Sequence, residues 1–253
     1  MNSIDKLIKT IKKLRSKDGC EWDRKQSHET PVPYLLEETY EVIEAIENKD
    51  YKALKEELGD LLLHVIFQAD IAEDNKIFSI KDAINNVNKK LVNRHPHIFN
   101  NKDDIKSKNL NWELIKQKEK KRDSVLDGIP IALPALLRAR RIQEKAAGVG
   151  FDWDKKDQVF NKIEEEVVEL KEALNSNNGI EEELGDVLFS VVNLSRHLNL
   201  DPEKTLKLSI EKFSKRFKRI EKDLNSKNIQ MQSLTLEELD EIWEKNKILD
   251  KKI

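Results

Sequence analysis

The sequence predicts an all-α protein made of two tandem helical bundles, and three observations support this fold class. Apolar residues recur at three- and four-residue steps along nearly the whole chain, which is the period of amphipathic helices. Glycine and proline number only seven and six in 253 residues, fewer than all-β folds or glycine-rich phosphate loops need. Landmarks of the first half also return in the second half in the same order.

The apolar period defines ten expected helices, and local signals mark several of their ends. Ser79 and Asp82 have capping-box spacing, and Asp201-Pro202 is typical of an N-cap followed by proline in the first helical turn. The stretch 175–179, Asn-Ser-Asn-Asn-Gly, is typical of a break between helices. The expected helices span 3–16, 33–48, 51–73, 80–93, 109–122, 134–147, 156–175, 180–198, 202–224 and 236–249.

Five landmarks repeat at a nearly constant offset, which indicates a tandem duplication. They are Trp22-Asp23 and Trp153-Asp154; the Glu37–Ala45 and Glu165–Ala173 elements; Glu56–Asp60 and Glu182–Asp186; Lys90/Arg94 and Lys212/Arg216; and Trp112/Lys116 and Trp243/Lys247. The Asp-Gly-Ile-Pro joint at 127–130 separates the copies. We therefore expect a first domain over 1–126 and a second over 127–253.

Composition limits the classes of function. The 46 Lys and Arg nearly cancel the 48 Asp and Glu, so no bulk positive field for nucleic acid exists and no direct nucleic-acid binding is expected. No apolar run approaches the ~18 residues of a membrane span. The single cysteine, Cys20, cannot form an intramolecular disulfide, which suits a reducing cytoplasm.

A stripe of carboxylates is the first candidate site. The expected helix 180–198 is apolar almost all round its axis, which predicts burial, and its polar stripe carries Glu183 and Asp186 one turn apart. Glu57 and Asp60 repeat this pattern in the first copy. Buried carboxylates that face another Glu-rich helix need a cation, and an all-oxygen donor set selects Mg²⁺ or Mn²⁺ over zinc.

Each copy also carries cations and a tryptophan. Lys212 and Arg216 are four residues apart on one helix, as are Trp243 and Lys247, and Lys162 lies one turn before the second Glu-rich element. Taken singly, these residues read as a solvated helix face and a core tryptophan. Their return behind both acidic stripes favours a pocket for a metal-bound polyphosphate that carries an aromatic base.

These patterns resemble a known family. The two E-E-x-x-E…E-x-x-D signatures, with Gly19–Asp23, Arg94–Phe99, Gly148–Trp153 and Asn193–His197, resemble the tandem two-domain bacterial members of the MazG-type nucleoside triphosphate pyrophosphohydrolases. The resemblance implies an all-α homodimer. It also implies Mg²⁺-dependent cleavage of normal and damaged NTPs or dNTPs to monophosphate and pyrophosphate. Broad base tolerance and a housekeeping or stress role in the nucleotide pool go with that activity.

The resemblance also implies roles for residues, with the second copy as the catalytic one. Metal ligands would be Glu166, Glu169, Glu183 and Asp186, with Glu38, Glu41, Glu57 and Asp60 as their first-copy counterparts. Nucleotide-binding residues would be Lys162, Glu166, Glu181, Glu182, Asp186, Lys212, Arg216, Trp243 and Lys247, the four cations on the phosphates and the tryptophan beside the base. Glu165 or Glu182 is the candidate general base. The first copy departs at Tyr34, where the second has Lys162; it is either a slow metal-binding copy or one that serves mainly in assembly.

Two alternatives remain open at this point. One is a non-enzymatic helical interaction protein whose acidic faces are simply solvated. The other keeps the fold but changes the substrate to dUTP or a phosphoribosyl nucleotide.

Overall fold

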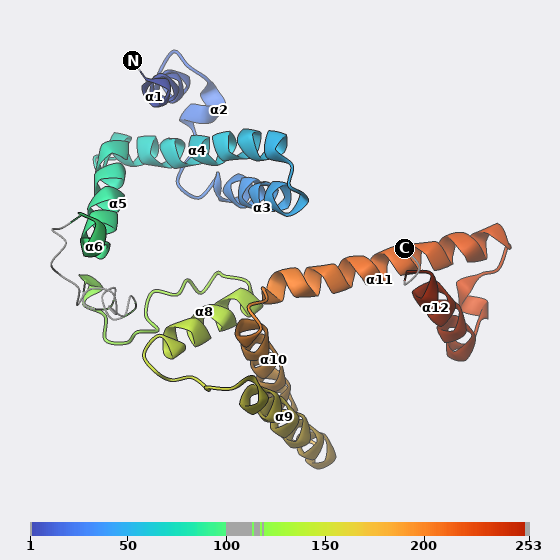
Figure 1. Ribbon diagram of the computed structural model, residues 1–253. Helices are drawn as coiled ribbons and strands as arrows, with labels where there is room; N and C mark the ends of the chain where they lie inside the picture. The colour runs from blue at the N-terminus through green and yellow to red at the C-terminus, as the bar shows by residue number, and fades with distance from the viewer. Residues whose placement is uncertain (1, 100–112, 114–116, 118, 251–253) are drawn as a thin grey trace. The chain divides into compact units, whose positions relative to one another are not determined.

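The regular secondary structure of the described part of the chain is entirely helical, which confirms the all-α fold class. The computed structural model describes residues 2–99, 113, 117 and 119–250, and contains helices and turns but no strand over these residues (Figure 1). The helices are α1 (Ser3–Leu14), α2 (Glu21–Arg24), α3 (Val32–Asn48), α4 (Tyr51–Asp74), α5 (Ile80–Arg94), α6 (Pro96–Phe99), α8 (Ala135–Ala147), α9 (Lys156–Ser176), α10 (Ile180–His197), α11 (Pro202–Ser226) and α12 (Leu236–Asp250), with a 3₁₀ turn, η2, at Met231–Ser233.

The expected helices match this order closely. Their ends differ from the observed ones by no more than two residues, apart from the helix expected at 109–122, which falls largely outside the described residues together with Trp112 and Lys116. The short helices α2 and α6 are not among the expected ones, because four residues are too few to show a helical period. None of the described helices combines the length and the apolar character that a bilayer crossing requires.

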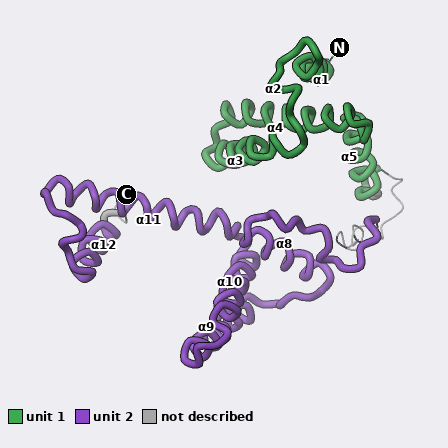
Figure 2. The backbone as a smooth tube through the Cα atoms, turned by 180° about the vertical axis from the view of Figure 1, so that it is seen from behind, with its two compact units in different colours: residues 1–108 green, residues 109–253 purple. Residues whose placement is uncertain are grey.

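The chain divides into two compact units, residues 1–108 and 109–253 (Figure 2). In the second unit the ammonium of Lys145, on α8, donates to the carbonyls of Val125 (2.8 Å) and Asp127 (2.9 Å). These two bonds hold residues 125–127, which precede α8 in the sequence, against that helix. The expected domain boundary between residues 126 and 127 marks the joint between the two sequence repeats, and it stays a prediction.

In the first unit, α3 and α4 form a hairpin and α1 crosses α4. Lys49 adopts a left-handed conformation (φ 56°) and ends α3. Asp50 then caps α4 by accepting from the backbone N–H groups of Lys52 and Ala53, both at 3.0 Å. The core lies where α1 meets α4, and its buried members are Ile11, Ile66, Phe67 and Ile71.

In the second unit, α9 and α10 form the corresponding hairpin. Asn177 (φ 52°) and Gly179 (φ 73°) turn the chain between them, and glycine suits the second position because L side chains rarely adopt that conformation. α8 packs against α10, where the Gln143 side-chain amide donates to the Phe189 carbonyl (2.8 Å). α11 begins at α8 and α10, and α12 packs back on α11 (Figure 1).

One stripe of each long hairpin helix is uncovered. Leu58, Leu62 and Val65 are exposed on α4, and Leu184, Leu188 and Val191, the equivalent positions, are exposed on α10. The prediction that these helices are buried on all sides is therefore wrong within each described unit. A composition that is apolar all round shows that a helix needs covering, but it does not show whether the same chain supplies the cover.

Candidate functional site

The α9–α10 hairpin brings three of the predicted acidic residues together. Glu166 lies on α9, and Glu183 and Asp186 lie one turn apart on α10. Each offers a carboxylate oxygen within 4.8 Å of the others. The tight 177–179 turn sets this register because it starts α10 directly beside the end of α9. Like charges this close repel each other, so the arrangement favours a cation among them.

Lys162 supplies one such cation at the edge of the group. Its ammonium is 2.7 Å from a Glu165 oxygen and 2.8 Å from a Glu166 oxygen. These two contacts raise the pKa of Lys162 above its usual value, so the side chain stays charged. The predicted phosphate-binding lysine therefore lies against the acids themselves.

Glu169 lies beside the group of three. Its carboxyl shares a hydrogen bond with Glu166, and this contact, with partial desolvation and the charges of Glu166 and Glu183, raises the pKa of Glu169. The structure thus places all four predicted metal ligands of the second copy along one side of the hairpin.

The prediction that Glu183 and Asp186 face a protein interior is wrong within the described unit, and Glu166, for which no interior position was predicted, is buried instead. Glu166 is 6% exposed, whereas Glu183 is half-buried and Asp186 and Glu169 are exposed. The cause is the uncovered stripe of α10, since the sequence pattern cannot distinguish burial within one chain from burial between chains.

The first unit repeats the acidic group on its own hairpin. Glu38 and Glu41 of α3 and Glu57 of α4 offer oxygens within 4.8 Å of one another. Partial desolvation, with the charges of Asp60, Glu41 and Glu57, raises the pKa of Glu38. Desolvation and neighbouring carboxylates, Glu41 first, likewise raise the pKa of Glu57. No lysine corresponds to Lys162 here, because Tyr34 occupies that position.

Both acidic groups fit a hard divalent cation. Each is made of carboxylate oxygens with neither cysteine nor histidine, which suits Mg²⁺ or Mn²⁺ rather than zinc. Mg²⁺ binds oxygen at about 2.1 Å in an octahedron, so ligands of one ion lie about 3–4 Å apart. Oxygens within 4.8 Å of one another reach that spacing with small side-chain rotations.

Two further predicted residues lie at the hairpin turn. Glu181 and Glu182, in the first turn of α10, line a shallow, open depression with Asn177, Gly179 and Ile180. Glu182 is exposed there, one residue before the metal candidate Glu183, and Glu165 is exposed on α9 and paired with Lys162. Both candidate general bases are therefore accessible and next to the acidic group.

The remaining predicted residues gather on the α11–α12 hairpin. The Arg216 guanidinium lies 5.6 Å from the centre of the Trp243 ring, and Phe213 packs on the same ring at 5.0 Å. Lys247 pairs with Glu244 at 2.9 Å, and Lys212 is exposed one turn before Arg216. The described contacts thus group the predicted residues into two sets, an acidic one on α9–α10 and a basic-aromatic one on α11–α12.

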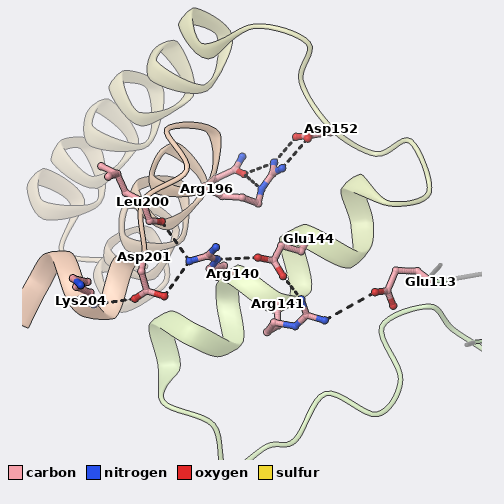
Figure 3. A network of polar contacts seen from close by, with 10 residues as sticks. Glu113, Arg140, Arg141, Glu144, Asp152, Arg196, Leu200, Asp201 and Lys204 are labelled. Atoms are coloured by element: carbon pink, nitrogen blue, oxygen red, sulfur yellow. Dashed lines mark hydrogen bonds and ion pairs between the residues drawn. The ribbon is translucent and has the colours of Figure 1, made fainter. Parts of the chain in front are cut away.

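A polar network that the sequence analysis misses anchors the start of α11 (Figure 3). Arg140 of α8 donates to Glu144 (2.8 Å) and to the side chain of Asp201 (3.0 Å), and Asp201 caps α11 by accepting from the backbone N–H of Lys204 (2.9 Å). Arg196, at the end of α10, binds Asp152 in the loop before α9. The Arg-Ala-Arg-Arg run at 138–141 is the sequence signal that could have indicated this network.

Comparison with known proteins gives a consistent result. The family model described as "MazG nucleotide pyrophosphohydrolase domain" matches residues 26–99 and 155–220, one stretch in each copy. The chain is 50% identical to "Nucleoside triphosphate pyrophosphohydrolase/pyrophosphatase MazG" of Thermotoga maritima, over 96% of this chain and 95% of that protein. It is 40% identical to "Nucleoside triphosphate pyrophosphohydrolase" of Escherichia coli K12, over 98% of each. It is also 39% identical to "Uncharacterized protein YabN" of Bacillus subtilis, over 94% of this chain and 50% of that protein.

Proposed function

Because the chain belongs to the MazG nucleotide pyrophosphohydrolase family, we propose that its second repeat holds the active site that cleaves nucleoside triphosphates to nucleoside monophosphate and pyrophosphate. The observation that carries this proposal is the acidic group of Glu166, Glu183 and Asp186, with Lys162 charged at its edge. The second repeat is favoured over the first because it alone has a lysine at that position.

The proposed cofactor is Mg²⁺, held by Glu166, Glu183 and Asp186 with Glu169 beside them. The oxygen chemistry of the four carboxylates suits this ion, and so does the spacing of Glu166, Glu183 and Asp186. When bound, the ion would supply charge neutralisation of phosphate oxygens and polarisation of water. Mn²⁺ has the same ligand preference and is the expected substitute.

The other side chains divide the remaining tasks. Lys162, Lys212, Arg216 and Lys247 are proposed to bind phosphate oxygens, and Lys and Arg stabilise the charge that develops on a leaving pyrophosphate. Trp243 is proposed to lie beside the base, where an indole face tolerates many ring systems. Glu165 or Glu182 is the proposed acceptor of the proton from the attacking water, since both are exposed next to the acidic group.

A homodimer is the proposed assembly. The exposed stripes of α4 and α10 support it, because the same three positions of each repeat leave Leu or Val side chains in water. A second copy of the chain offers the same stripe, which makes a two-fold contact self-complementary. A cytoplasmic location remains a prediction, which the substrate class supports.

The test compares two acidic substitutions. Glu183→Gln removes one charge from the acidic group with almost no change of shape, and Glu172→Gln removes an exposed charge from the same hairpin outside that group. With Mg²⁺ and a panel of NTPs and dNTPs, Glu183→Gln should lower the rate of pyrophosphate release about 100-fold or more, a size typical of losing one preorganised electrostatic contact. Glu172→Gln should leave the rate unchanged.

Product identity and substrate choice complete the test. The expected products are monophosphate and pyrophosphate, with several bases accepted. Equal rates in Glu183→Gln and the unmodified chain, at equal helical content by circular dichroism, would contradict the assignment and support the interaction-protein alternative. Turnover of dUTP or a phosphoribosyl nucleotide alone would keep the fold and the chemistry but replace the substrate.

A further inference from the structure

The solvent-facing side of α1 carries a row of lysines that the proposed activity does not use. Lys6, Lys9 and Lys13 are exposed and follow one another at steps of three and four residues, which places them on one face of the helix. Together with Thr10 and Leu14 they line a shallow, open groove of about 510 Å³. These three lysines form the lysine face of α1.

The fold keeps this face towards solvent. The opposite side of α1 packs on α4, where Ile11 is 1% exposed and Leu7 and Ile8 contact the apolar core. Arg15, directly after the helix, forms an ion pair with Asp70 of α4 at 2.7 Å. The helix is therefore held along its apolar side and at its C-terminal end, and the lysine face stays on the outer side.

Within the described residues, the lysine face has no acidic partners of the kind that a neighbouring lysine has. Lys12, on the same helix, binds Glu73 of α4 at 2.9 Å. In contrast, Lys6, Lys9 and Lys13 form no ion pair with any residue that the structure describes. Like charges one turn apart on a helix repel each other, so an anion that lies along the lysine face relieves this repulsion.

This separation of charge does not appear in the composition. The 46 Lys and Arg nearly cancel the 48 Asp and Glu over the whole chain, and the expectation of no direct nucleic-acid binding rests on that balance. A net charge averages over the whole surface, whereas the field that an anion meets depends on charges within a Debye length, about 8 Å at physiological salt. Along the lysine face that local charge is positive.

The second repeat does not carry the lysine face. Counted back from the repeated Trp-Asp landmark, the equivalent positions in α8 are Leu137, Arg140 and Glu144. Arg140 is bound to Glu144 (2.8 Å) and to Asp201 (3.0 Å), in the polar network at the start of α11. One positive charge of the three remains there, and acidic side chains already neutralise it. The lysine face is thus a property of the first unit and not of the repeated fold.

The chemistry of the lysine face distinguishes among anionic partners. Protein interfaces have an apolar centre, are poor in lysine and depend on Trp, Tyr and Arg, whereas the groove offers Leu14 as its one apolar side chain. An anionic membrane binds helices whose apolar side can enter the lipid, and the apolar side of α1 is packed on α4. A phosphate backbone needs neither feature, because its contacts with lysine depend on charge.

We propose that the lysine face binds the phosphate backbone of nucleic acid without reading its bases. The rise from Lys6 to Lys13 is about 10.5 Å, at ~1.5 Å per residue of helix. Each strand of a duplex carries one phosphate per ~3.4 Å of axis, which gives about three phosphates over that length. The three lysines therefore match three successive phosphates in number and in span.

The experiment measures the fluorescence anisotropy of short labelled oligonucleotides with the full chain, in a metal chelator and over a range of salt concentrations. Single-stranded RNA, single-stranded DNA and duplex DNA are the probes. Three phosphate contacts predict a slope of log K against log salt concentration of about −2 for single strands and about −3 for duplex DNA. Single-stranded RNAs of equal length and different base sequence should bind alike, because no base is read.

Lys9→Gln removes the middle contact of the lysine face, and Lys12→Gln is the matched control, an exposed lysine of the same helix that is paired with Glu73. On single strands, Lys9→Gln should reduce the size of the slope by about 0.7, which weakens binding about 8-fold near 50 mM salt. Lys12→Gln should leave the slope unchanged. Glutamine has nearly the helix propensity of lysine, so helical content by circular dichroism should stay the same.

Each outcome decides the proposal. It is overturned if no probe shows salt-dependent binding, or if Lys9→Gln and Lys12→Gln bind alike. It is also overturned if Lys212→Gln, a change in the proposed phosphate-binding set of α11, abolishes the binding while Lys9→Gln does not. Poly-L-glutamate that binds more tightly than the nucleic acids would replace the proposal with an acidic protein partner.

This inference goes beyond the proposed activity and does not rest on it. Lys9→Gln should release pyrophosphate at the rate of the unmodified chain, because Lys9 lies in the first unit and belongs to neither acidic group. Conversely, Glu183→Gln should bind the oligonucleotides as the unmodified chain does. A failure of either assay therefore leaves the other unaffected.

Discussion

Lys162 offsets part of the negative charge of the acidic group. Its ammonium touches Glu165 and Glu166 within 3 Å, and the raised pKa of Lys162 keeps it positively charged. A divalent ion at Glu166 would compete with this internal cation for the same carboxylate. Binding of the ion and release of Lys162 towards phosphate are therefore expected to be linked.

Lys162→Gln tests that link. Without its internal competitor the acidic group should bind Mg²⁺ about two- to five-fold more tightly, because a partly exposed ion pair contributes at most about 1 kcal/mol. The KM for nucleoside triphosphate should rise at the same time, since a phosphate contact is lost. Titration calorimetry with Mg²⁺ measures the first effect, and Lys171→Gln, an exposed lysine of the same helix, is the control. Unchanged or weaker Mg²⁺ binding would contradict the competition.

Asp152 gives a prediction on pH at the same scale. The Arg196 guanidinium lowers the pKa of Asp152 below its ordinary value of 3.8, against the opposing effect of burial, and His197 lowers it further. A carboxyl whose folded pKa is depressed stabilises the fold above its unfolded value and loses that contribution as pH falls through the folded one. Asp152→Asn should therefore reduce the free energy of unfolding by about 1–3 kcal/mol near neutral pH.

The difference between the Asp152→Asn and unmodified chains should shrink as pH falls below 3.8. Urea unfolding at a series of pH values measures it, and urea, being uncharged, does not screen the ion pair. Asp154→Asn, an exposed neighbour, should show no such dependence. A constant difference across the series would show that the Arg196 contact does not stabilise the fold through the Asp152 charge.

At the scale of elements, the two hairpins α3–α4 and α9–α10 place the acids and α11 carries the cations. Each hairpin needs a tight turn with left-handed residues, Lys49 in one and Asn177 with Gly179 in the other. α11 begins at a polar anchor, the Asp201 cap held by Arg140 (Figure 3). Arg216 lies fourteen residues beyond Pro202, about 21 Å along the helix, so a small change of angle at the anchor is amplified at the cations.

Asp201→Ala tests the anchor. It removes both the N-cap of α11 and the partner of Arg140, and should lower the free energy of unfolding by about 1–2 kcal/mol, the usual effect of a lost N-cap. Urea unfolding followed by circular dichroism measures it. Asp223→Ala, which breaks only an exposed ion pair with Lys227 on the same helix, should change the free energy of unfolding by less than about 0.5 kcal/mol. Equal effects of the two substitutions would rule out a special role of the cap.

At the scale of the whole molecule, the uncovered apolar stripes of α4 and α10 are the observation that supports the proposed homodimer. Leu184, Leu188 and Val191 follow one face of α10 at helical spacing, and α4 carries the same face in the first unit. A contiguous apolar face of this kind marks a protein–protein contact. In the proposed homodimer, the half-buried and exposed acids on the same helix are expected to become less accessible to solvent when that contact forms.

Leu188→Glu should therefore prevent self-association. The unmodified chain is expected to sediment as a dimer and Leu188→Glu as a monomer, because a charge in the middle of an apolar contact is left unpaired. Sedimentation velocity over a range of concentrations measures this. Ile131→Glu, at a residue 80% exposed and outside both stripes, should leave the dimer intact. A monomeric unmodified chain would contradict the assembly.

The local parts of the fold were predictable because their causes are local. Apolar period, capping residues and breakers placed the helices to within two residues, and the repeat of Glu and Asp positions indicated that Glu166, Glu183 and Asp186 share a site. Four-residue helices such as α2 were not predicted, because a helical period needs several turns to become visible in the sequence. The cavity lined by Trp22, Tyr34 and Phe67 could not be predicted, because its walls come from helices distant in the sequence.

The sequence by itself determined the all-α class, the duplication and the residues that carry charge, since a helix and its faces depend on neighbours three and four positions away. The pairing of Lys162 with Glu165 and Glu166 is of this local kind. Only the tertiary structure decided which side chains meet between helices: that Arg216 lies on Trp243, and that Trp22, Tyr34 and Phe67 line one cavity. It also decided that the apolar stripes of α4 and α10 stay uncovered in each unit. Contacts of this kind depend on how helices pack in three dimensions, and the period of a helix does not contain that information.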